Sequence, residues 1–69
     1  MDIIKLNEEY IKLGQALKAA NLVGSGVEAK FVIQDGLVKV NGEVNLQRGK
    51  KLFGGEVVEF NGEQVKIEK

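Results

Sequence analysis

The sequence predicts a small α+β domain in which a pair of helices packs on one face of a small antiparallel β-sheet. Apolar residues recur at helical spacing up to about residue 36 and then alternate with polar residues, which is the period of a strand. Two Asn-Gly pairs, at 41–42 and 61–62, each lie between alternating segments, and Asn-Gly favours the positive φ angles of a tight hairpin turn. No Pro-rich, Ser-rich or low-complexity linker interrupts the chain, so we expect one domain spanning residues 1–69.

The first part of the chain is predicted to hold a short strand followed by a helix. The segment 2–6 is short and contains β-branched residues, which indicates a brief strand or an extended arm. Helix one is predicted at residues 12–21, although Gly14 weakens it by up to ~1 kcal/mol relative to Ala. The apolar arc of this helix consists of Leu13, Ala16, Leu17 and Ala20.

Helix two is predicted to begin at Ser25, because Ser25 and Glu28 have the S-x-x-E spacing of a capping box. In that motif the Ser25 hydroxyl accepts from the Glu28 amide, and the Glu28 carboxylate accepts from the Ser25 amide. Gly36 is expected to end the helix in a left-handed conformation. Phe31 lies beside the predicted buried stripe and is expected to pack in the core, a partly exposed ring being the alternative. The stripe consists of Ala29, Val32 and Ile33.

The second half of the chain predicts two hairpins joined by a basic loop. Residues 37–40 and 43–44 flank the first Asn-Gly turn, and residues 56–60 and 64–67 flank the second. Val65 and Ile67 should face inward. The loop 47–51 leads to Leu52-Phe53 and to a flexible Gly54-Gly55 pair.

Composition argues against catalysis and against a membrane span. The chain has no His and no Cys, and therefore lacks the commonest general base, the thiol nucleophile and the best transition-metal ligands. We expect no enzyme activity, no metal and no cofactor. No apolar run reaches the ~18–20 residues of a membrane span, and the first residues do not resemble a signal peptide. We therefore expect a cytoplasmic protein without a membrane partner.

The formal net charge of zero conceals a segregation of charge along the sequence. Seven basic and three acidic residues lie between Lys12 and Lys51, a net charge of +4, and each flank has a net charge of −2. This distribution predicts one basic face, which attracts phosphate through its local potential. The alternative is a solvated surface on which the charges are uneven by chance.

Two segments are candidates for phosphate contact. Gly24-Ser25-Gly26 precedes helix two and could hold an anion on its backbone amides, together with Lys30, but a simple helix cap explains Ser25 equally. Arg48, Lys50 and Lys51 lie within four residues of one another, and Gly49 allows close approach of the backbone. A solubilising loop that protects a sheet edge is the competing interpretation.

The order of these motifs resembles the S-four domain, an RNA-binding module named after ribosomal small-subunit protein S-four and also called the alpha-L motif. More narrowly, it resembles stand-alone bacterial proteins of the YaaA/YbcJ type. The match covers roughly residues 10–60. The segments that carry it are Leu13-Gly14-Gln15-Ala16-Leu17-Lys18, Ser25-Gly26-x-x-Ala29-Lys30, Ile33-x-x-Gly36-x-Val38-x-Val40-Asn41-Gly42-Glu43, Arg48-x-Lys50-Lys51-Leu52 and Gly55-Glu56-x-Val58.

The resemblance implies the alpha-L fold and non-catalytic binding of structured RNA, ribosomal or transfer, with the ribosome as a candidate partner. Longer family members often carry arginines at the start of helix one and just before helix two, and their absence here predicts fewer bidentate phosphate contacts. The RNA-binding residues implied by the resemblance are Ser25, Gly26, Lys30, Asn41, Arg48 and Lys51, and the charge distribution adds Lys18 and Lys50.

We expect recognition mainly of RNA shape, because the four aromatic residues do not suggest a platform on which single-stranded bases stack. We also expect a monomer. The alternative function is a small protein–protein interaction module, with the ribosome as a candidate location, whose acidic flanks contact a basic partner. A sulfur carrier is not supported, since the Gly-Gly pair is internal and the chain ends Ile67-Glu68-Lys69.

Overall fold

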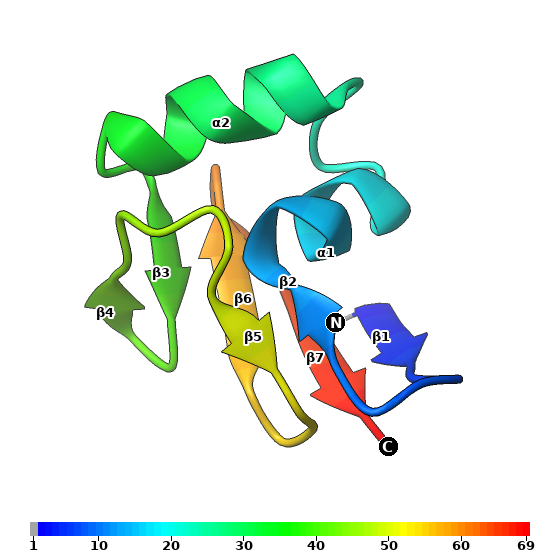
Figure 1. Ribbon diagram of the computed structural model, residues 1–69. Coiled ribbons are helices and arrows are strands. Elements are labelled where there is room, and N and C mark those ends of the chain that lie inside the picture. The colour runs from blue at the N-terminus through cyan, green and yellow to red at the C-terminus, as the bar shows by residue number, and fades with distance from the viewer. Residues whose placement is uncertain (1) are drawn as a thin grey trace.

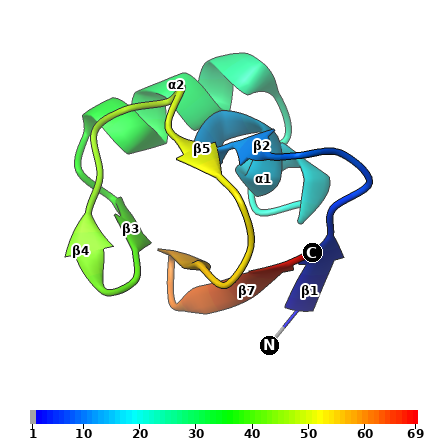
Figure 2. The ribbon, with the colours of Figure 1, turned by 60° about the horizontal axis from the view of Figure 1, so that its bottom comes forward.

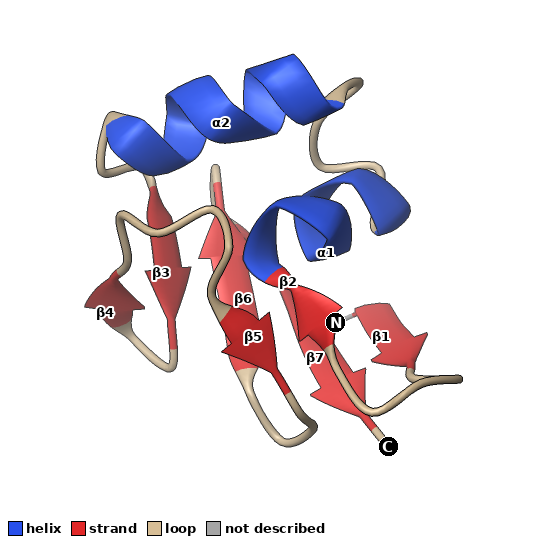
Figure 3. Cartoon of the chain, in the orientation of Figure 1, coloured by secondary structure: helices blue, strands red, loops and turns tan. Residues whose placement is uncertain are grey.

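The computed structural model describes residues 2–69 and has two layers, a five-stranded sheet and a covering layer on one face of it (Figures 1 and 2). Two helices and a separate two-stranded ribbon form the covering layer, and Figure 3 distinguishes helices, strands and loops. The helices are α1 (Leu13–Ala19) and α2 (Gly26–Gln34), and the strands are β1 (Asp2–Lys5), β2 (Ile11–Lys12), β3 (Val38–Val40), β4 (Glu43–Val44), β5 (Lys51–Leu52), β6 (Val57–Phe60) and β7 (Glu63–Glu68).

The five-stranded sheet has the order β1-β7-β6-β3-β4. The predicted α+β class, with a helix pair on a sheet, is confirmed, but the sheet is mixed. β1 pairs with β7 in parallel, with Asp2 opposite Val65 and Lys5 opposite Glu68, whereas the other pairs are antiparallel. A hairpin turn forces its two strands to be antiparallel, but no turn connects β1 with β7, so local sequence does not set their direction.

Both predicted hairpin turns are present. The φ angles are 53° and 84° at Asn41 and Gly42, and 55° and 78° at Asn61 and Gly62. Asn41 also joins the first hairpin to β6, because its Oδ1 accepts from the Val57 N–H at 2.9 Å and its own N–H donates to the Val57 carbonyl at 2.8 Å.

The ends of α2 follow the prediction with one difference. The Ser25 Oγ accepts from the Glu28 N–H at 3.1 Å, and Gly36 follows the helix with a φ of 76°. The Glu28 carboxylate, however, accepts from the N–H of Gly24 at 2.7 Å and not from that of Ser25. The predicted reciprocal capping box is therefore only half formed, because the carboxylate reaches one residue further back along the chain.

The core lies between the sheet and the covering layer, and it includes the inward-facing Val65 and Ile67, as predicted. The predicted core position of Phe31 is wrong, since this side chain is 58% exposed. At about 100° per residue, position 31 is about 160° away from both Ala29 and Ile33, so burying those two turns Phe31 toward solvent. The fully buried side chains of largest volume are Leu13, Leu17, Ile33, Leu52, Ile67, Val38, Val58 and Val65.

The ribbon formed by β2 and β5 has no counterpart in the sequence prediction. Its two strands pair antiparallel with Ile11 opposite Leu52 and Lys12 opposite Lys51. Two residues are too few to display a period of two, so the pairing is visible only once the chain has folded.

Candidate functional site

The basic loop 47–51 is attached to the first turn of α1. The N–H of Leu13 donates to the Lys50 carbonyl at 2.8 Å, and the N–H of Gly14 donates to the Arg48 carbonyl at 3.1 Å. A Cβ at position 14 would lie 2.7 Å from Arg48 Cγ, closer than carbon atoms pack. Gly14 therefore lowers the intrinsic stability of the helix but allows the loop to approach it.

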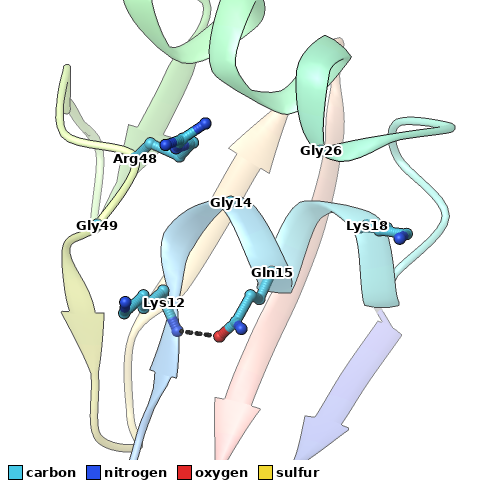
Figure 4. A pocket seen from close by; sticks show the side chains of 7 residues that line it. All are labelled: Lys12, Gly14, Gln15, Lys18, Gly26, Arg48 and Gly49. Atoms are coloured by element: carbon cyan, nitrogen blue, oxygen red, sulfur yellow. Dashed lines mark hydrogen bonds between the residues drawn. The ribbon is translucent and has the colours of Figure 1, made fainter.

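This attachment creates a surface pocket of about 370 Å³ between the loop, α1 and the start of α2. Figure 4 shows Lys12, Lys18 and Arg48 around it, together with Gln15. The three cations come from three places in the chain: the end of β2, the last turn of α1 and the basic loop. Glycines 14, 26 and 49 complete the lining.

The pocket has the electrostatic character of an anion site. Among the described residues that line it, three are cationic and none is acidic. The Gln15 Oε1 accepts from the backbone N–H of Lys12 at 3.2 Å, which holds the amide beside the pocket (Figure 4). Three cations without a carboxylate among them produce a local positive potential although the whole chain is neutral.

The structure brings together part of the predicted site. Lys18, Gly26 and Arg48 line the same pocket, and Ser25 directly precedes Gly26 as the N-cap of α2. Lys30 is exposed four residues after Gly26, and hence on the same side of α2. Five of the eight predicted residues thus lie in or beside one concave region.

Lys12 was not among the predicted residues. Its signal in the sequence is weak, because it differs from the other lysines only in directly preceding helix one. The relevant fact is its cross-strand position opposite Lys51, which local sequence does not reveal.

The other three predicted residues do not line this pocket. Asn41 is in the β3–β4 turn, at the end of β3 remote from α2 (Figure 1), where its side-chain oxygen is bonded to β6. The Lys51 Nζ lies 4.8 Å from the centroid of the Tyr10 ring, in a cation–π contact. Lys50 is half-buried at the end of the loop, and its positive charge stabilises the ionised form of Glu56.

Glu56 organises the turn that follows β5. Partial burial raises its pKa, but this effect is outweighed by hydrogen bonds from the N–H groups of Phe53 and Gly54 and by the charge of Lys50, so the pKa lies below its ordinary value. The two bonds measure 2.9 Å and 2.8 Å. The ionised carboxylate therefore fixes the backbone next to Phe53.

The predicted anion cradle at residues 24–26 needs correction, because the Gly24 N–H already donates to the Glu28 carboxylate.

In the part of the chain that the structure describes, no group of three or more acidic side chains is placed to hold a metal ion. No helix within residues 2–69 has the length and apolar character required to cross a membrane.

The fold and the pocket define a class of small α+β proteins with a cationic concavity between a helix pair and a loop. Comparison with known families is more specific: the S4 domain model matches residues 4–68, and the chain belongs to the S4 domain family. The predicted family resemblance is thereby confirmed.

Two bacterial relatives and one solved structure illustrate the relationship. The chain is 44% identical over 59 residues to a probable ribosome maturation protein, RlbA, of Bacillus subtilis, covering 86% of this chain and 83% of that one. It is 34% identical over 58 residues to the putative RNA-binding protein YbcJ of Escherichia coli, covering 84% and 83%. The solution structure of YbcJ, described as revealing an alfaL motif involved in RNA-binding, superposes with a TM-score of 0.76 at 31% identity, covering 100% of this chain and 89% of that one.

Proposed function

We propose that this protein binds structured RNA, ribosomal or transfer, without catalysing a reaction, through the pocket and the adjoining side of α2. One observation carries the proposal: Lys12, Lys18 and Arg48 line one concavity whose described lining contains no carboxylate. A polyanion with phosphates at regular intervals can engage several such cations at once. The contacting residues are proposed to be Lys12, Lys18, Ser25, Gly26, Lys30 and Arg48.

The relatives support this proposal from a second direction. YbcJ is named as an RNA-binding protein and RlbA as a probable ribosome maturation protein. A ribosomal or transfer RNA as ligand agrees with the expected cytoplasmic location and with a single domain acting as a monomer. The side-chain bond of Asn41 to β6 and the proximity of Lys50 to Glu56 make these two residues weaker candidates for direct contact.

The test is a titration of ribosomal and transfer RNAs at several salt concentrations. If four or five phosphates are contacted, the logarithm of the association constant should fall with the logarithm of salt at a slope of roughly −3 to −4.5. A Lys18→Ala/Arg48→Ala variant should bind more weakly, with the slope reduced in magnitude by about 1 for each lost contact.

The matched control is Lys39→Ala/Lys66→Ala, which removes the same charge from the opposite face of the sheet. Lys39 lies between the buried Val38 and Val40, and Lys66 lies between two buried residues of β7, so both side chains point away from the helices. The control variant should retain the slope of the parent protein. Equal losses in both variants would show that only total charge matters and would refute the pocket as the site.

A protein partner is the second candidate function. The observation in its favour is the exposure of Val27 (63%) and Phe31 (58%), which lie one turn apart on α2. Pull-down with and without ribonuclease separates the two functions, because complexes that survive RNA digestion depend on protein contacts.

A further inference from the structure

The solvent face of the β2–β5 ribbon has an unusual composition. Because alternate residues of a strand point to opposite faces, the pairing of Ile11 with Leu52 toward the core turns the residues on either side of them outward. Leu52 is fully buried, and Ile11 packs against the core. The four outward residues are Tyr10, Lys12, Lys51 and Phe53, two aromatic side chains and two cations.

Three of these side chains, Tyr10, Phe53 and Lys51, form a contact cluster. The ring centroids of Tyr10 and Phe53 are 5.9 Å apart, with the rings inclined at 55°, and the Lys51 ammonium lies over the Tyr10 ring. Lys12 is directly opposite Lys51 in the ribbon and also lines the pocket described above. The ribbon face is thus continuous with the proposed RNA site, and it supplies the aromatic surface that the sequence did not suggest.

Two features of the ribbon face do not serve folding. Lys12 and Lys51 are like charges directly opposite each other in an antiparallel pair, which is a destabilising arrangement. Phe53 points to the opposite side from the buried Leu52 and leaves 47% of its surface exposed to solvent. An anion near the two lysines would offset their repulsion, and a flat apolar group on the Phe53 ring would cover its exposed surface. A nucleotide carries both groups.

We infer that the ribbon face binds one unpaired nucleotide of the RNA, with its base stacked on Phe53 and its phosphates held by Lys12 and Lys51. This inference rests on the proposed function and deepens it. Tyr10 packs beside Phe53 and holds Lys51 in place, while Glu56 fixes the backbone N–H of Phe53. A base inside a duplex already has both faces stacked, so the exposed ring selects a bulge, a loop or a strand end. The RNA is therefore a folded one that presents an extruded base next to a paired region, whose phosphates occupy the pocket.

The experiment uses three RNA duplexes of one sequence: fully paired, with a single bulged 2-aminopurine, and with an abasic nucleotide at the bulge. The protein should bind the 2-aminopurine duplex roughly 5- to 150-fold more tightly than the abasic one, the range expected for one stacked base. Stacking should also change the fluorescence of the 2-aminopurine. Phe53→Leu, which keeps an apolar side chain but lacks a ring, should remove most of the preference and the fluorescence change. The matched control is Phe31→Leu, which deletes another exposed ring on α2 and should preserve both.

The failure of this inference is distinguishable from failure of the proposed function. Phe53→Leu should weaken binding without altering the salt slope, because it removes no phosphate contact, whereas Lys51→Gln should reduce the slope by about 1. Equal affinity for the bulged and abasic duplexes, or an undiminished preference in Phe53→Leu, would overturn the stacked nucleotide while leaving the pocket intact. A Phe53→Leu variant with a lower Tm but unchanged binding would show that the ring only closes the ribbon. Absence of RNA binding by the unaltered protein would refute the proposed function itself.

Discussion

Replacing Gly14 by Ala tests whether the basic loop is held as tightly against α1 as the structure indicates. Ala has the higher helix propensity, so the substitution by itself should stabilise the helix by up to ~1 kcal/mol. The new Cβ, however, would lie 2.7 Å from Arg48 Cγ, 3.4 Å from its Cδ and 3.7 Å from its carbonyl oxygen. Optimal carbon–carbon separations are about 3.5–4.0 Å, so Arg48 must move by roughly 1 Å.

Moving Arg48 should cost more free energy than the higher helix propensity of Ala supplies. Inserting a methyl group into a filled space costs about 1–3 kcal/mol, and here it also strains the hydrogen bond from Gly14 to Arg48. Subtracting the propensity gain leaves a net destabilisation of about 1 kcal/mol, or a Tm lower by about 4–8 °C for a domain of this size. Since Arg48 lines the pocket, affinity for RNA should fall as well.

Thermal unfolding followed by circular dichroism measures the effect, with Gly26→Ala as the matched control. Gly26 is also helical, but a Cβ there would meet nothing within 4 Å, so its Tm should stay unchanged or rise. A Gly14→Ala variant whose Tm rises as in the control would refute the close approach of the loop and, with it, this explanation for the glycine.

Three further outcomes are expected from single substitutions. Glu56→Gln should lower the free energy of unfolding at neutral pH by about 1 kcal/mol, through weaker hydrogen bonds at residues 53–54. The folded state lowers the pKa of Glu56, so the stabilisation by its carboxylate is complete above the ordinary pKa of 4.5 and is lost as pH falls through the folded pKa. Urea titrations should therefore show the two proteins converging in acid. Asn41→Ala should cost about 1–2 kcal/mol, since it removes the acceptor for the Val57 N–H and places Ala at a φ of 53°, and Asn41→Asp, which retains the acceptor, should recover much of that loss by the same measurement. Ser25→Ala should cost about 1 kcal/mol in thermal unfolding by removing the cap on Glu28, whereas Ser25→Asp should preserve stability.

Features of the fold that depend on neighbouring residues could be predicted from the sequence. The Asn-Gly pairs, the Ser25 cap and the left-handed Gly36 each follow from conformational preferences within a few positions, and all three are present. The motif order likewise sufficed to predict the family. Phe31 is the exception: its hydrophobicity predicts a core position, but the helical angle turns it away from the buried stripe and its side chain is exposed.

The candidate site was predicted less completely, because it is assembled from distant segments. Lys18, Gly26 and Arg48 were found through charge and resemblance, whereas Lys12 became visible only as a member of the pocket. The Tyr10–Phe53 pair was missed entirely, since the two rings are brought together by the pairing of β2 with β5.

Local sequence predicts the beginning and end of α2, the two hairpin turns, and a basic middle between acidic ends, since these properties depend on local conformation and on the order of charges. The bounds of α1 were predicted less well, because the expected helix covered residues 12–21 and the observed one spans Leu13–Ala19. Tertiary packing sets the parallel direction of β1 against β7, the position of the basic loop against Gly14, and the surface that two lysines and two aromatic rings share. Contacts between segments far apart in the sequence depend on how the whole core packs, and no short stretch of sequence contains that information.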